Sequence, residues 1–166
     1  MNYFVGTKMI TAIAMTRQEY NDYRGWKLPS DEDGSDVGFL VEYSYDEQTT
    51  PNHENHVGYI SWSPENVFNG AYKASGEMNF GHALEILKAG GRVSRSGWNG
   101  KNMFIFLVQG STFTVNREPL ISILGEGTEV NYHGHVDMRT ADGTIVPWLC
   151  SQTDMLANDW GVVPDA

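Results

Sequence analysis

Apolar and polar positions alternate over short stretches, a pattern typical of short β-strands. In the first half of the chain this pattern predicts strands at 8–15, 39–43 and 57–62. In the second half it predicts strands at 92–95, 103–108, 113–115, 128–139, 145–146 and 160–163. The run 103–108 is continuously apolar, which predicts a central strand buried on both faces. The strict alternation over 128–139 places His133, His135 and Asp137 on one face.

Helices are predicted where a capping side chain precedes an amphipathic run. The predicted helices are 17–23 after the cap Thr16, a helix from Pro64 after Ser63, 80–89 after Asn79, 119–124, and one from Ser151 to Asn158. Gly25 is expected to end the first of them. The side chains expected to face inward are Val67, Phe68 and Ala71 in the second helix and Phe80, Ala83, Leu84 and Leu87 in the third.

The segment Ala74, Ser75 and Gly76 is small and flexible in composition, and a newly capped helix follows it. We therefore predict two small domains, over 1–75 and 77–166. The expected fold class is α+β, and the second domain is expected to be a mostly antiparallel sheet with short helices packed on it.

Charge and composition narrow the possible ligands. The 166 residues carry a net charge of −10, from 11 basic and 21 acidic side chains, which argues against binding of DNA or RNA. A small phosphorylated ligand remains possible, because backbone N–H groups and one or two cations can hold it.

One cysteine and the lack of a leader or of an apolar run of about 20 residues predict a cytoplasmic protein without membrane partners.

The stretch SGWNGK at 96–101 places Trp98 and Asn99 between two glycines. A tight bend there would present the indole to a base and the carboxamide to a polar group. The alternative is a hairpin turn whose tryptophan folds back onto the sheet.

A second candidate for ligand binding is the start of the last predicted helix. Ser151 is the expected N-cap, with Asp154 three residues on, and the helix N-terminus offers unpaired N–H groups. Trp148 precedes this segment, so the indole and the amides together suit a nucleotide. The alternative is a capped helix beside a core tryptophan.

Two further groups of side chains could carry chemistry. His133, His135 and Asp137 have the spacing of strand-borne zinc ligands, but the expected role is a polar strand face that packs at a subunit interface or lies in water, and we expect no metal and no cofactor. Cys150 near a helix N-terminus has the position of a reactive thiol, but a small structural cysteine is the expected role.

Five motifs over residues 78–163 resemble, in order, those of the second Thoeris anti-defence family of small phage proteins. They are MNFGHALEILKAG, SGWNGK, MFIFLV, TEVNYHGHVDMRTADG and VPWLCSQTDMLANDW. Cys150 stands where a small residue such as alanine is expected. Residues 3–73 resemble a separate group of phage segments with the signatures EYNDYRGW and GYISWSPENVF, for which the resemblance implies no function.

The resemblance implies a non-enzymatic protein that sequesters a signalling nucleotide, glycocyclic ADP-ribose, in the cytoplasm of the infected host. It also implies a homo-oligomer, a dimer or tetramer, with pockets between subunits. The implied ligand-binding residues are Trp98, Asn99, Trp148, Ser151, Gln152, Thr153 and Asp154. Arg95 or Lys101 is expected to help neutralise a phosphate of the ligand. The alternatives are binding of cyclic dinucleotides, an enzyme that degrades the same nucleotide through His133, His135 and Asp137, and a host-protein binder.

Overall fold

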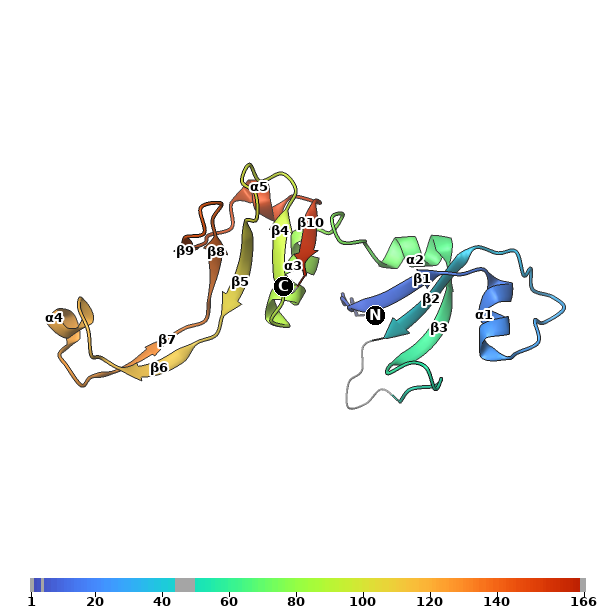
Figure 1. Cartoon of the computed structure of the whole chain (residues 1–166), viewed down its shortest axis with the longest axis horizontal. Helices are drawn as coiled ribbons and strands as arrows, with labels where there is room; N and C mark the ends of the chain where they lie inside the picture. Colours follow the sequence, from blue (N-terminus) through green and yellow to red (C-terminus); the bar gives the residue numbers. More distant parts are fainter. Residues whose placement is uncertain (1, 4, 44–49, 165–166) are drawn as a thin grey trace. The chain divides into compact units, whose positions relative to one another are not determined.

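The computed structural model describes residues 2–3, 5–43 and 50–164, and its chain divides into two compact units, Met1–Lys73 and Ala74–Ala166. Residues 74–76 therefore belong to the second unit. Ser75 Oγ accepts a 2.8 Å hydrogen bond from the Val162 N–H, and the Gly76 N–H donates to the Trp160 carbonyl at 2.9 Å. Every paired strand is antiparallel and the helices are short, so the predicted α+β class is confirmed (Figure 1). None of the helices described is long and apolar enough to cross a bilayer.

The first unit is a three-stranded sheet with two helices. Its elements are β1 (Ile10–Ala14), α1 (Arg17–Arg24), β2 (Gly38–Tyr43), β3 (Tyr59–Pro64) and α2 (Glu65–Ala71), with the strands in the order β1-β2-β3. Thr16 caps α1 as predicted, and Gly25 ends it at a φ of 67°, a left-handed conformation that glycine adopts without strain. Tyr20 of α1 packs on Leu40 and Ile60 to form the core.

The start of α2 differs from the prediction. Ser63 is the penultimate residue of β3, and Pro64, whose side chain has no hydrogen-bonding atom, takes the N-cap position. Phe68 faces inward and stacks on Phe39 at 4.0 Å between ring centroids, but Val67 and Ala71 are exposed. The inward assignment of Val67 and Ala71 was wrong because a seven-residue helix turns only one narrow face toward the sheet.

The second unit is built on a five-stranded sheet. Its elements are α3 (Phe80–Lys88), β4 (Arg92–Arg95), β5 (Phe104–Val108), β8 (His135–Arg139), β9 (Ile145–Pro147), α5 (Gln152–Met155) and β10 (Trp160–Val163), with strand order β10-β4-β5-β8-β9. Asn79 caps α3 as predicted. The buried residues of α3 pack against those of the sheet, and the core comprises Met78, Ala83, Ile86, Leu87, Val93, Ile105 and Trp160. Leu84, predicted inward, is exposed, and Ile86 is buried in α3.

A bent ribbon extends from the β5–β8 hairpin (Figure 1). It consists of β6 (Ser111–Thr114), β7 (Glu129–Tyr132) and the short helix α4 (Leu120–Leu124). The strand predicted over 128–139 is therefore two strands, interrupted at His133 and Gly134. The interruption lies opposite Gln109 and Gly110, where a Cβ on Gly110 would come within 2.9 Å of the Tyr132 carbonyl oxygen. Gly110 and Gly134 lie on the two opposite strands, so the hairpin can bend there while the strands on both sides of the bend keep the same pairing register.

Candidate functional site

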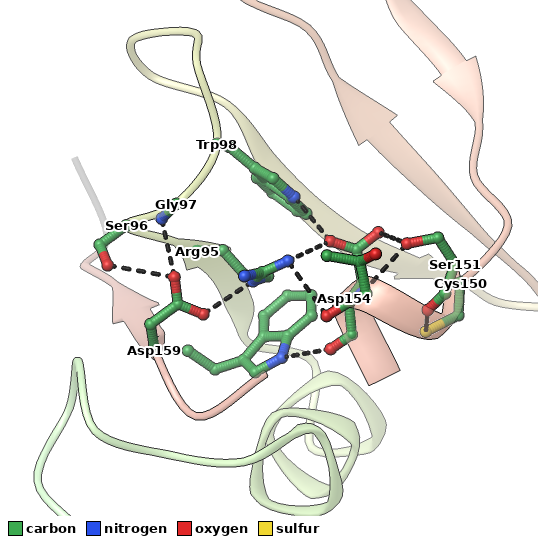
Figure 2. A network of polar contacts seen from close by, with 10 residues as sticks. Arg95, Ser96, Gly97, Trp98, Cys150, Ser151, Asp154 and Asp159 are labelled. Atoms are coloured by element: carbon green, nitrogen blue, oxygen red, sulfur yellow. Dashed lines mark hydrogen bonds and ion pairs between the residues drawn. The ribbon is translucent and has the colours of Figure 1, made fainter. Parts of the chain in front are cut away.

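The carboxylate of Asp154 joins the bend after β4 to the N-terminus of α5. Its Oδ1 accepts hydrogen bonds from Arg95 Nη1 at 2.7 Å and from Trp98 Nε1 at 2.9 Å, and its Oδ2 accepts one from Ser151 Oγ at 2.7 Å. Figure 2 shows these groups converging on one carboxylate. Arg95 and Trp98 lie 59 and 56 residues before Asp154, whereas Ser151 lies only three residues before it, so the contacts join the two predicted candidate segments into one site.

Arg95 lies between two carboxylates (Figure 2). Its Nε donates to Asp159 Oδ1 at 2.7 Å, while its Nη1 donates to Asp154. The other oxygen of Asp159 accepts the Gly97 N–H at 2.7 Å and the Ser96 hydroxyl at 3.2 Å. Asp159 therefore holds the backbone of the bend as well as the guanidinium. The expected role of Arg95 in neutralising a phosphate is limited by this arrangement, because both carboxylates already balance its charge.

Local sequence explains how Asp154 is placed. The Ser151 hydroxyl accepts the Asp154 N–H at 3.0 Å, so Ser151 is the N-cap, as predicted. Helix α5 ends at Met155, earlier than the predicted Asn158, and its Asp154 carbonyl accepts the Trp160 indole N–H at 3.1 Å. Both the side chain and the carbonyl of Asp154 are thus occupied by indole donors.

Three tryptophans surround this network. Trp160 is fully buried, and the rings of Trp98 and Trp148 meet it edge-on, with centroids 5.4 Å and 6.3 Å away. Trp98 and Trp148 are half-buried, so each indole is partly packed on the core and partly accessible. Trp98 packs against the core, as the alternative interpretation of the SGWNGK bend expects, and part of its indole stays accessible.

The remaining predicted site residues belong to the same two segments of the chain. The Thr153 carbonyl oxygen accepts a hydrogen bond from Arg95 Nη1 at 3.4 Å. The side chains of Asn99, Lys101 and Gln152 are exposed. Sequence reasoning missed Asp159, although its position directly before the buried Trp160 was a usable signal.

The protonation states of the network follow from these contacts. Arg95 and the Gly97 N–H hold the pKa of Asp159 below its usual range. Burial opposes ionisation of Asp154, but the hydrogen bonds from Ser151, Trp98 and Arg95 outweigh it and lower the pKa of that carboxyl. Burial and the nearby Asp154 raise the pKa of the Cys150 thiol. The carboxylates therefore stay charged at neutral pH and the thiol stays protonated.

The histidine pair lies elsewhere in the second unit. His133 falls at the strand interruption, and His135 Nε2 lies 3.6 Å from Asp137 Oδ1. Within residues 2–3, 5–43 and 50–164, the structure brings no three His, Cys, Asp or Glu side chains into an arrangement that holds a metal ion.

The lowered pKa values of Asp154 and Asp159 predict a pH-dependent stability. Both pKa values are lower in the folded protein than in the unfolded chain. The contribution of the two carboxylates to the free energy of unfolding is therefore complete above about pH 5, and it is lost as the pH falls through their pKa values in the folded protein. Urea midpoints measured from pH 6 to pH 3 should therefore fall. The fall should be smaller in Asp159→Asn, and an equal fall in that variant would contradict this assignment.

The second unit, which contains this network, matches known proteins. The model of the Thoeris anti-defense 2-like domain matches residues 78–163, a range that contains the whole network. The Thoeris anti-defense 2 protein of Bacillus phage SP01 is 45% identical over 92 residues, which cover 52% of this chain and 96% of that protein. The chain therefore belongs, through its second unit, to the Thoeris anti-defense 2-like family of phage anti-defence proteins.

Proposed function

We propose that this protein protects a phage against Thoeris defence by binding and retaining a signalling nucleotide of the cyclic ADP-ribose type, such as glycocyclic ADP-ribose. The proposal places it in the cytoplasm of the infected host and assigns it no catalytic step. The observation that carries it is the Trp98–Asp154 hydrogen bond, which holds an indole beside the N-terminus of α5.

The proposed contacts combine stacking with hydrogen bonds. The accessible parts of Trp98 and Trp148 stack on the base, and the exposed Asn99, Gln152 and Thr153 bind its edge and the ribose. Lys101 supplies positive charge for a phosphate. Arg95 acts as a positioning residue, because its contacts with Asp154 and Asp159 fix the bend that carries Trp98.

A site with these ionisation states supports retention rather than turnover. Asp154 and Asp159 are already paired with donors, so their proton affinity is low. A nucleotide sponge needs slow release, which depends on a preorganised site, and the network of Figure 2 supplies that rigidity.

The proposal includes a homo-oligomer. Leu149 and Leu156, which flank α5, are 91% and 77% exposed. Apolar side chains grouped this way favour burial against another molecule. A second copy would cover them close to the site, which agrees with a pocket completed between subunits.

The test is a calorimetric titration of the full chain with glycocyclic ADP-ribose, cyclic ADP-ribose and a cyclic dinucleotide in turn. Bound protein is then separated from free ligand, denatured by heat, and the released compound is identified by mass. Recovery of the intact nucleotide supports sequestration. A cleaved product, or no binding of any of the three, would overturn it.

A further inference from the structure

The first unit leaves one edge of its sheet open. Strand β1 is the outer strand of the order β1-β2-β3 and pairs with β2 through five residues, from Ile10 opposite Tyr43 to Ala14 opposite Phe39. Within the residues that the structure describes, no other strand pairs with β1. Its residues from Thr11 onward are exposed, and Ile13 is 62% exposed.

The opposite edge of the same sheet is protected. The side chain of Asn52 donates to the Ile60 carbonyl at 2.9 Å and accepts the Ile60 N–H at 2.8 Å, so it occupies the outward hydrogen-bonding groups near the start of β3. Pro64 then ends that strand. Natural sheets usually protect an edge with such contacts, with proline or with charged side chains. Strand β1 has neither a charged residue nor a proline along its length.

The sequence of β1, Ile-Thr-Ala-Ile-Ala, is complementary to itself. When two copies lie antiparallel with all five residues overlapping, Ala12 faces Ala12, Thr11 faces Ile13, and Ile10 faces Ala14. Every pair is uncharged, and each large side chain meets a smaller one, which suits close cross-strand packing. In this register the flanking Lys8 lies opposite Thr16, so no like charges meet.

We propose that β1 pairs antiparallel with β1 of a second copy, in the register that places Ala12 opposite Ala12, and that this joins two first units into one six-stranded sheet. Five residues of strand edge bury less surface than a stable dimer needs. The pairing therefore rests on the proposed homo-oligomer, in which the second units hold two first units at a high local concentration.

Disulfide trapping tests the register in the full chain. In a Cys150→Ser background, Ala12→Cys places two thiols on strands whose opposed Cα atoms are about 4.5–5.5 Å apart, within disulfide range. The matched control is Ala14→Cys, an equally exposed alanine on the same strand. In this register the Cα atoms of position 14 in the two chains would be about 13 Å apart, too far for a disulfide. Molar mass by light scattering is measured on the reduced proteins before oxidation.

We expect Ala12→Cys to form the disulfide-linked dimer at least tenfold faster than Ala14→Cys, and both to link equally slowly in urea. Equal rates in the folded proteins, or faster linking at position 14, would overturn the pairing. An oligomer by mass without selective linking rejects β1 pairing alone. A monomer by mass with selective linking at higher concentration supports β1 pairing and rejects the oligomer of the second unit.

Discussion

Replacing Asp154 with alanine is expected to lower the free energy of unfolding of the second unit by about 1–3 kcal/mol, the cost of leaving a largely buried donor without its acceptor. Asp154 and Arg95 have side chains only 13% and 12% exposed. The substitution leaves the Trp98 indole N–H without an acceptor and leaves Arg95 Nη1 with only the Thr153 carbonyl, at 3.4 Å, while both donors stay largely out of water. The loss of the Ser151–Asp154 side-chain contact adds to the effect at the start of α5.

Hydrogen exchange over a urea series, read on peptides from 92–98 and 150–160, measures this loss within the second unit. The matched control is Glu85→Ala, which removes an exposed carboxylate that pairs with Lys88 at 2.7 Å on α3. That change should cost less than about 1 kcal/mol, as is usual for surface pairs. If the two variants lose the same free energy, Asp154 is not the centre of a buried network.

Replacing Trp98 with alanine is expected to weaken nucleotide binding by roughly 5- to 150-fold, the range that corresponds to about 1–3 kcal/mol for one stacked base. Trp98→Phe should lose less affinity, because the smaller ring still stacks while only the hydrogen bond to Asp154 disappears. Trp26→Ala in the first unit is the control, since Trp26 is 52% exposed and lies outside the family match.

Isothermal titration of the three variants with the nucleotide that binds the unmodified protein measures these changes. Thermal unfolding of each variant separates loss of the site from loss of the fold. Unchanged affinity in Trp98→Ala would remove this indole from the proposed pocket. Equal losses in Trp98→Ala and Trp26→Ala would indicate a general effect instead of a local one.

Features that depend on a few neighbouring residues were predictable from the sequence. The N-caps Thr16, Asn79 and Ser151 were identified because a capping side chain bonds an N–H three residues ahead. The turn between β8 and β9 is equally local: Gly143 has a φ of 89°, a conformation that glycine adopts without strain. The one predicted cap that failed, Ser63, was displaced because β3 continues pairing with β2 through Pro64.

The site and the bend of the long hairpin depended on contacts between distant residues. The sequence by itself determined the two units, the α+β class and the two segments that carry Trp98 and Asp154. Only the tertiary structure decided that Arg95 is held by Asp154 and by Asp159, 64 residues away, and that Gly110 and Gly134 interrupt both strands together. A helix cap or a turn is stabilised by contacts between residues a few positions apart, so the local sequence predicts it. The pairing of buried charges and the bending of a ribbon depend instead on which strands the fold brings side by side.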